Sequence, residues 1–407
     1  MFKHFLIIIS IGVFSSCNVA DNEVSMKKGN TEIQLVSNDK DLSDCQYLTT
    51  DNNGNPVISW VQGEDVEACF YYAISTDNGS SFNAPIKVLP TLGLSPHHES
   101  MPKIAFKANG TAIVVYARKS PTPKNRFAGA LFYIQSNDNG VNWSTQEYLH
   151  YGDTTKGVGR GFFDVTTLPD GEVGAIWLDG RKKSRDGSSL FFAKTNKHNR
   201  FQNEIELDDK TCQCCRTELY VDKDKNINAT YRDIIHDSIR DMAHLYSNDF
   251  GETFSPPKRI SSDNWVINGC PHTGPTMSED EDGLHFYWFT MGGGEGVYHT
   301  SLKKQEGNFS ERSLLSSSAR HPQTANISSG GVAIVWEENV EVDAVLRNRI
   351  GFLTEANGIK QEAIFISPDS VDASYPVILG LPDNKVLIAW NQRGENAYQV
   401  YYQLITF

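Results

Sequence analysis

Seven short apolar runs, each ending in an aromatic residue, constrain the fold of this chain more than any other feature. Successive closing aromatics lie 56, 61, 54, 57, 48 and 54 residues apart. Turns rich in glycine, asparagine and aspartate precede the runs, and no helical periodicity lies between them. This repetition predicts an all-β fold in which each repeat forms one four-stranded sheet. The runs end at Trp60, Tyr116, Trp177, Tyr231, Trp288, Trp336 and Trp390.

The two ends of the chain predict how the sheets close into a ring. Only one more strand-like segment, 398–405, follows the last run, so the last sheet lacks a fourth strand. The segment 31–36 near the N-terminus can supply it and so remove exposed sheet edges. We therefore predict a single β-propeller over residues 31–407 with seven four-stranded blades. A six-bladed ring with one atypical insertion is the alternative.

A second repeat has the form Ser-x-Asp-x-Gly-x-x-aromatic and occurs at 75–82, 136–143 and 247–254. The aspartate can accept backbone N–H bonds across a tight turn, the glycine supplies a positive φ, and the aromatic is expected to tuck under the hairpin. The pattern resembles the Asp-box (BNR) repeat of the sialidase superfamily of β-propellers. The resemblance implies that these turns lie on the outside of the blades, away from an axial site. Sialidases usually have six blades, so seven would depart from the family.

The first 30 residues are predicted to carry export signals and to lie outside the folded domain. Lys3 and His4 precede an apolar run, 5–14, that is too short to span a membrane, and Phe14-Ser15-Ser16-Cys17 follows. Small residues before a cysteine resemble a bacterial lipobox. We expect a lipoprotein signal peptide at 1–16, lipidation at Cys17 and a tether at 17–30, with a plain secretory signal as the alternative. The protein would then be exported and lipid-anchored, on the outer membrane.

The charge of the chain limits its partners. The formal net charge is −13 at pH 7, which argues against a nucleic-acid partner. We expect membrane contact only through the lipid anchor, and a monomeric protein.

The innermost strand of each blade should begin at the axial mouth of the ring, and those beginnings are unusually polar. Arginines, histidines, carboxylates and one tyrosine would converge there, which is costly unless a ligand or metal uses them. The seven stretches begin near Asp44, His97, Arg160, Cys214, Cys270, Arg320 and Asp372.

The resemblance to sialidases implies arginines that hold a sugar carboxylate and a tyrosine nucleophile activated by a carboxylate. Arg216, Arg320 and Tyr375 occur in the family's order, with Glu218 or Asp164 as the partner base and Asp372 or Glu99 as an acid. Two features depart from the family. The first blade has Gln46 where an Arg-Ile-Pro stretch would stand, and Arg216 comes one blade too early.

A polysaccharide lyase is the second enzymatic interpretation. Some propeller lyases use histidine and tyrosine to remove the proton next to a uronate carboxylate, and His98, His272 and Tyr375 would suit this chemistry. We therefore expect a propeller that binds or cleaves an acidic glycan, as an exo-glycosidase or a lyase, without a required cofactor. The predicted substrate-binding residues are Gln46, Arg160, Arg216, Arg320 and His321.

The cysteines leave a non-enzymatic alternative open. Cys212, Cys214 and Cys215, with the distant Cys270, can surround Zn²⁺ or Cu(I). In an oxidising compartment the same residues could instead form two disulfides, with Cys45 and Cys69 forming a third. A metal-binding or protein-interaction propeller is thus the alternative to the enzyme.

Overall fold

The computed structural model describes residues 31–151, 157–182, 187–269, 271–303, 307–356 and 358–407. The predicted signal peptide, the tether, Cys17 and Cys270 lie outside these ranges. The only helices in the described part of the chain are three short 3₁₀ turns, Asp65–Glu67, Leu89–Thr91 and His98–Ser100. None of them is long and apolar enough to cross a membrane.

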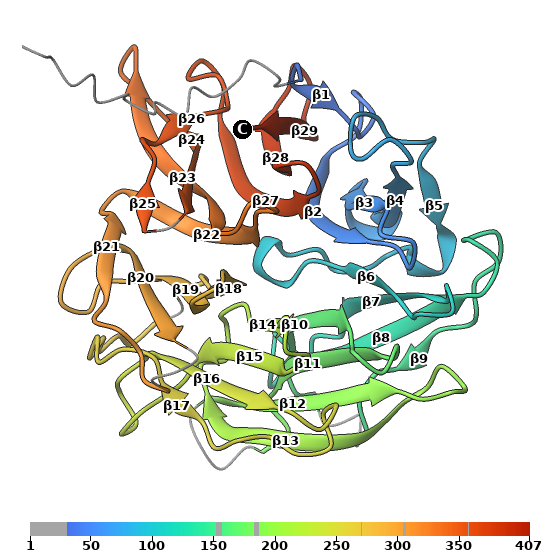
Figure 1. Cartoon of the computed structure of the whole chain (residues 1–407). Coiled ribbons are helices and arrows are strands. Elements are labelled where there is room, and N and C mark those ends of the chain that lie inside the picture. Colours follow the sequence, from blue (N-terminus) through green and yellow to red (C-terminus); the bar gives the residue numbers. More distant parts are fainter. Residues whose placement is uncertain (1–30, 152–156, 183–186, 270, 304–306, 357) are drawn as a thin grey trace, which may run out of the picture.

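Seven antiparallel sheets stand around a common axis, which confirms the seven-bladed propeller (Figure 1). Blade 1 contains β2 (Ser43–Thr50), β3 (Pro56–Gln62), β4 (Cys69–Ile74) and β5 (Ile86–Val88), and blade 2 contains β6 (Lys103–Phe106), β7 (Ala112–Lys119), β8 (Gly129–Ser136) and β9 (Glu147–Tyr148). Blade 3 contains β10 (Arg160–Thr167), β11 (Val173–Asp179), β12 (Ser188–Thr195) and β13 (Phe201–Thr211). Blade 4 contains β14 (Glu218–Val221), β15 (Ile227–Arg232), β16 (Met242–Ser247) and β17 (Lys258–Arg259).

The remaining three blades complete the ring. Blade 5 contains β18 (Thr276–Glu279), β19 (Gly283–Thr290), β20 (Gly296–Lys303) and β21 (Ser313–Ser316). Blade 6 contains β22 (Ala319–Asn326), β23 (Val332–Val342), β24 (Val345–Ala356) and β25 (Ile359–Lys360), and β26 (Ile364–Phe365) also pairs with β24. Blade 7 contains β27 (Ala373–Leu381), β28 (Lys385–Arg393), β29 (Tyr398–Thr406) and the N-terminal β1 (Gln34–Leu35).

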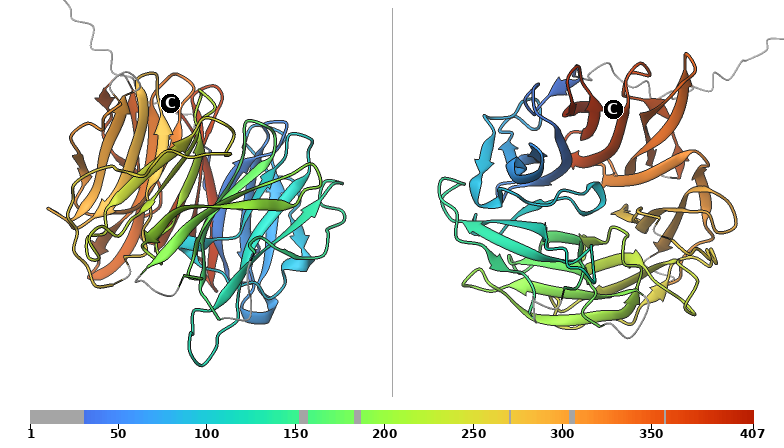
Figure 2. Two further views of the ribbon diagram at one scale, coloured as in Figure 1. Left: turned by 90° about the horizontal axis from the view of Figure 1, so that it is seen from below. Right: turned by 180° about the vertical axis from the view of Figure 1, so that it is seen from behind.

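The two ends of the described chain meet in blade 7. Strand β1 pairs with β29, with Gln34 opposite Tyr402 and Leu35 opposite Tyr401. Seen from behind, the blue and dark-red ends lie side by side (Figure 2). The predicted closure by an N-terminal strand is therefore confirmed, although the paired part is only two residues long.

In the second strand of four blades, a buried tryptophan donates to the side chain of the residue two positions later. Two residues apart on a strand share a face, so the buried indole N–H finds an acceptor on its own strand. Such a bond removes the cost of burying an unpaired donor. The indole Nε1 atoms of Trp60, Trp177, Trp336 and Trp390 donate to Gln62, Asp179, Glu338 and Gln392 over 3.4, 3.3, 3.0 and 3.0 Å.

The Asp-box turns fold as their sequence predicts. The Ser136 hydroxyl donates to Asp138 over 2.8 Å and accepts the Gly140 N–H over 2.9 Å, while Asp138 accepts the Asn142 N–H over 2.8 Å. The turns at 75–82 and 247–254 repeat these bonds.

The aromatic residue of each Asp-box also reaches the preceding blade. The rings of Trp143 and Tyr72 meet edge to face with centroids 6.3 Å apart. Phe254 contacts Phe192 at 4.9 Å in the same way, and Phe82 contacts Tyr402 at 5.0 Å. Each box therefore connects two blades as well as closing its own hairpin.

Gly140 in the second Asp-box should tolerate no side chain. Its φ is +83°, and a Cβ atom there would lie 2.1 Å from the Tyr72 hydroxyl oxygen. We expect Gly140→Ala to lower the free energy of unfolding by about 1–3 kcal/mol more than Gly54→Ala. Gly54 is the matched control because its φ is +80° but no atom lies within 4 Å of the added Cβ. Urea unfolding measures both, and equal losses would contradict the proposed contact between blades.

Four of the innermost strands begin with the same distortion. Their register with the next strand breaks near the axial mouth, and one non-glycine residue in each break has a left-handed backbone. Such residues cost about 1–3 kcal/mol each and cluster at functional sites. The four residues are Cys45, Phe162, His321 and Tyr375, with φ of 55°, 51°, 48° and 52°.

Candidate active site

A cavity of about 340 Å³ lies where the innermost strands begin. Blades 2, 5, 6 and 7 supply its walls, through the segments before β6 and β18, the first residues of β22 and β27, and the end of β19. Five predicted site residues line it, namely His98, His272, Arg320, His321 and Tyr375. The others are His97, Glu99, Pro271, Thr273 and Phe289.

Tyr375 lies between two histidine rings. Its ring is parallel to the His98 ring, and the two centroids lie 4.1 Å apart. The centroid of the His321 ring lies 4.8 Å from that of Tyr375. Burial raises the pKa of Tyr375 to about 12, and the nearby carboxylates Glu337 and Glu99 add to the rise. The phenol therefore keeps its proton at neutral pH.

Both backbone polar groups of Tyr375, whose φ is 52°, are hydrogen-bonded to side chains. Its N–H donates to Glu337 Oε2 over 2.8 Å, and its carbonyl oxygen accepts from Gln46 Nε2. Gln46 is 1% exposed and does not line the cavity. It positions Tyr375 rather than facing a bound ligand.

His321 forms a buried ion pair with Glu337, whose Oε1 is 2.8 Å from Nδ1. Burial alone would lower the pKa of His321, but the Glu337 carboxylate raises it above its ordinary value. Conversely, burial would raise the pKa of Glu337, but His321 and the Tyr375 N–H lower it. The pair therefore favours the protonated form of an imidazole that lines the cavity.

His98 has a carboxylate behind it and a free nitrogen. Its Nε2 lies 3.9 Å from Asp44 Oδ2, and its Nδ1 has no hydrogen-bond partner among the described residues. Burial raises the pKa of Asp44, and His98 opposes that rise. The ring of His98 lines the cavity, so its imidazole could act as a base toward a ligand bound there.

The opposite wall is formed by two more histidines. The rings of His97 and His272 lie 5.7 Å apart, and Phe162 contacts both, at 5.4 and 6.3 Å. Burial, assisted by His272, lowers the pKa of His97 to about 4. His97 Nδ1 accepts the Glu99 N–H over 3.1 Å, so neutral His97 presents Nε2–H as a donor.

Arg320 lies at the exposed rim of the cavity. Its side chain is 50% exposed, and its Nη2 pairs with Glu295 Oε1 over 2.8 Å. Its guanidinium also lies over the Phe289 ring, 5.4 Å from the centroid. An arginine paired only at the surface can exchange that partner for a ligand carboxylate at little cost.

Arg216 lies under the cavity and is not one of its lining residues. Its Nη1 is 3.1 Å from Glu99 Oε1, and its Nη2 donates to the carbonyl oxygens of Gly274, Pro275 and Pro322 over 3.5, 3.4 and 3.1 Å. Glu99 also accepts the Gly274 N–H over 3.2 Å. This arginine therefore joins blade 4 to blades 2, 5 and 6.

The remaining predicted site residues are also outside the cavity lining. Asp164 binds Lys103 Nζ over 2.6 Å and the Leu219 N–H over 2.7 Å. Glu218 accepts the Met277 N–H over 2.9 Å. Arg160 donates to Asp179 over 2.9 Å, the same carboxylate that receives the Trp177 indole.

The family model described as BNR repeat-like domain matches residues 64–268. That span is 205 of the 407 residues, just over half of the chain. The chain belongs to the BNR repeat-like domain family. The resemblance to sialidase-superfamily propellers is therefore confirmed. No curated protein matches the sequence.

Solved structures match this BNR repeat-like propeller at low sequence identity. A protein of unknown function from Dyadobacter fermentans has a TM-score of 0.52 at 13% identity, covering 77% of this chain and 97% of that one. The Hadza microbial sialidase Hz136 has a TM-score of 0.49 at 12% identity and coverages of 86% and 76%. A Penicillium chrysogenum alpha-L-arabinanase has a TM-score of 0.48 at 15% identity and coverages of 77% and 96%.

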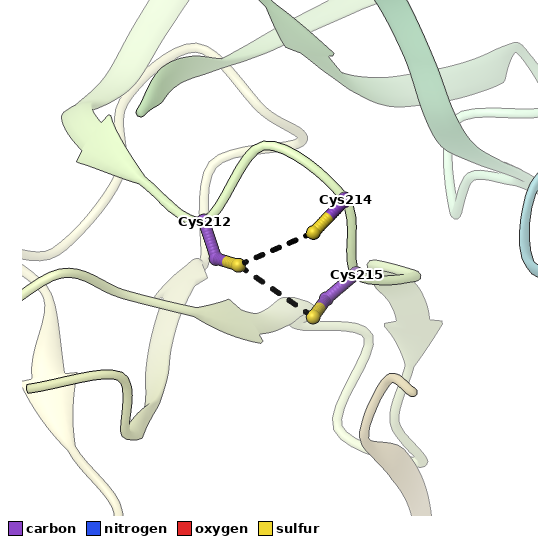
Figure 3. A group of neighbouring side chains, drawn as sticks. All are labelled: Cys212, Cys214 and Cys215. Carbon is purple, nitrogen blue, oxygen red and sulfur yellow. Dashed lines mark hydrogen bonds between the residues drawn. The ribbon is translucent and has the colours of Figure 1, made fainter. Parts of the chain in front are cut away.

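The cysteines of this BNR repeat-like propeller are free thiols wherever the structure describes them, so the proposed Cys45–Cys69 disulfide is absent there. Cys212, Cys214 and Cys215 nevertheless converge, as predicted, in the loop between β13 and β14 (Figure 3). Cys212 Sγ lies 3.8 Å from Cys214 Sγ and 3.7 Å from Cys215 Sγ.

Two residues of the BNR repeat-like site were missed in the sequence, because Phe289 lines the cavity and Glu337 supports it. Of the two candidate acids, Glu99 lines the cavity and Asp372 does not. Glu337 directly follows the aromatic that closes the second strand of blade 6. The second strand runs antiparallel to the innermost one, so its end returns to the axial mouth. A polar residue just after a closing aromatic therefore predicts a side chain near the axial mouth.

Glu218 should make stability depend on pH. Burial raises its pKa to about 8, and the Asp164 charge adds to the rise. A carboxyl with a raised pKa stabilises the fold below its ordinary value of 4.5, and that contribution is lost as the pH rises through about 8. Between pH 4.5 and about 8, the unsubstituted protein should lose stability and Glu218→Gln should not. The urea midpoint of Glu218→Gln should therefore exceed that of the unsubstituted protein by a margin that grows with pH. Glu281→Gln, in an exposed turn, is the matched control. A constant difference between Glu218→Gln and the unsubstituted protein would contradict the assignment.

Proposed function

We propose that the axial cavity binds an acidic sugar residue of a glycan and cleaves the chain there by β-elimination. The observation that carries the proposal is the position of Tyr375 between His98 and His321, with Glu337 behind His321. Membership of the sialidase superfamily supports a glycan as the ligand.

Charge favours an acidic ligand over a neutral one. Glu99 is already paired with Arg216, whereas Arg320 and His321, whose pKa Glu337 raises, line the cavity. A sugar carboxylate could pair with both cations and gain charge-assisted hydrogen bonds. The excess of negative charge on the whole chain does not prevent this, because the local cations dominate at short range.

The cavity residues suit the two proton transfers of an elimination. The His98 imidazole would take the proton from the carbon next to the carboxylate. The electrons of that C–H bond form a carbon–carbon double bond as the neighbouring glycosidic C–O bond breaks. The leaving oxygen takes its proton from the Tyr375 phenol, and His321 with Arg320 stabilises the negative charge that develops on the carboxylate.

The geometry favours elimination over sialidase-type hydrolysis. A sialidase-type site needs arginines that hold the sugar carboxylate together. Here Arg320 is the only arginine among the residues that line the cavity, and Arg216 is engaged by Glu99 beneath it.

Incubation with uronic-acid polysaccharides, sialosides and neutral glycans tests the proposal. We expect an unsaturated product, detected by its ultraviolet absorbance, from a uronate polymer alone. Release of sialic acid without unsaturation would contradict elimination. Failure to bind any acidic glycan would contradict the cavity itself.

Arg320→Gln tests recognition of the carboxylate. Loss of a charge-assisted bond worth about 1.5–3 kcal/mol should raise KM for the acidic polymer about 10–100-fold. Arg200→Gln is the matched control, because Arg200 is 68% exposed and lies 3.9 Å from Glu147 on an outer strand. An equal change in both variants would show that Arg320 acts only through surface charge.

A further inference from the structure

The three thiols of Cys212, Cys214 and Cys215 (the cysteine cluster) form a compact triangle that the glycan site does not use. All three sulfurs lie within 4.8 Å of one another, and the side chains point toward a common centre (Figure 3). Two edges of the triangle measure 3.8 and 3.7 Å. A point equidistant from the three corners then lies about 2.1–2.4 Å from each sulfur, which brackets the usual metal–thiolate bond.

The cysteine cluster is closed off from water. The three cysteines are 1%, 5% and 1% exposed, and Ile234 and Phe162 pack against them. Phe162 separates the cluster from the axial cavity, since its ring contacts His97 and His272 on the other side. Thiols in such a setting are protected from bulky oxidants, but a small ion can still reach them through local motion.

A buried cation lies beside the cysteine cluster. Arg232 is 1% exposed, its carbonyl oxygen accepts the Cys212 N–H over 2.8 Å, and its charge reaches the Cys212 and Cys215 thiols. Its guanidinium donates to the carbonyl oxygens of Arg240, Thr273 and Phe289, and its Nε has no partner among the described residues. A buried guanidinium bonded only to carbonyls favours negative charge nearby.

We propose that Cys212, Cys214 and Cys215 bind one Cu(I) ion as three thiolates. Soft thiolate ligands select Cu(I), Zn²⁺ or iron–sulfur clusters, and structural Zn²⁺ almost always takes four ligands. Among the described residues, the group that could hold an ion here consists of these three cysteines alone. A trithiolate complex of Cu(I) carries two negative charges, which would compensate Arg232 in the same buried space.

Competition between the full-length protein and a chromogenic Cu(I) chelator, under anaerobic reducing conditions, tests this site. We expect each chain to take about one equivalent of Cu(I) from the chelator and to bind it through three thiolate ligands. Cys214→Ser should lower the affinity by more than the roughly 10–100-fold typical of losing a supporting residue. Cys69→Ser is the matched control, because Cys69 is a free buried thiol in blade 1. Cys45→Ser tests the other group of potential ligands, Asp44, Cys45 and His98.

A second measurement does not depend on whether the variants fold. Bound Cu(I) should protect the three cysteines of the cluster, and not Cys69, from alkylation in the unsubstituted protein, as read by peptide mass spectrometry. Undiminished binding in Cys214→Ser, or its loss in Cys45→Ser, would overturn the site. Tighter binding of Zn²⁺ than of Cu(I) would overturn the choice of metal. A disulfide within the cluster that reforms after reduction and prevents metal binding would overturn the proposal altogether.

Discussion

Tyr375→Phe is expected to lower kcat on the acidic polymer about 10²–10⁴-fold and to leave KM nearly unchanged. The substitution removes the phenol proton that the leaving oxygen would receive. It keeps the ring between His98 and His321, which lie 4.1 and 4.8 Å from the Tyr375 ring centroid. Binding should persist, because Arg320 and His321 still face the sugar carboxylate.

Tyr398→Phe is the matched control for that experiment. Tyr398 lies in the same blade, donates its hydroxyl proton to Asp372 over 2.6 Å and does not line the cavity. It should retain kcat although it also loses a phenol hydroxyl. Equal kcat for Tyr375→Phe and the unsubstituted protein would show that another group protonates the leaving oxygen. A large rise in KM would instead indicate that the hydroxyl holds the substrate.

The blade count and the ring closure could be predicted from sequence because both depend on local patterns. A strand that closes on an aromatic, with a Gly- or Asn-rich turn before it, repeats often enough to count the blades. The two-residue pairing of β1 with β29 follows from the missing fourth strand. The Asp-box likewise forms its turn from bonds within eight residues.

The left-handed residues at the axial mouth could not be predicted in the same way. Local preference disfavours positive φ for a bulky residue such as Tyr375, and the conformation persists because distant groups hold it. The Tyr375 N–H and carbonyl are fixed by Glu337 of blade 6 and Gln46 of blade 1. The first bond joins consecutive blades, and the second arises only when blade 1 meets blade 7 and the ring is closed.

The sequence also did not predict which carboxylates pair with the buried arginines. Arg160 and Arg216 stand where innermost strands were predicted to begin, yet Asp179 and Glu99 engage them. Asp179 stands opposite Arg160 in the register of blade 3, whereas the contact of Arg216 with Glu99 depends on how blades 4 and 2 pack around the axis. Sequence position therefore located the site, and packing decided which of its charges remain available to a ligand.

Arg216→Met should lower the free energy of unfolding by about 3–5 kcal/mol, because it leaves the Glu99 carboxylate buried without its cation. Arg216 and Glu99 are 5% and 2% exposed, so water cannot replace the lost partner. Adding Glu99→Gln should restore much of the loss, and urea unfolding of the single and double variants gives the coupling energy.

A surface pair provides the control for this cycle. Lys194 Nζ lies 2.8 Å from Glu252 Oε1, but the Glu252 side chain is 68% exposed, so Glu252→Gln should cost less than about 1 kcal/mol. The same experiment separates two roles for Arg216. If Arg216 only joins the blades, Glu99→Gln should rescue both stability and activity in Arg216→Met. If stability is restored and turnover is not, Arg216 reaches the sugar carboxylate in the bound state, and the cavity then contains a second arginine, closer to a sialidase-type site.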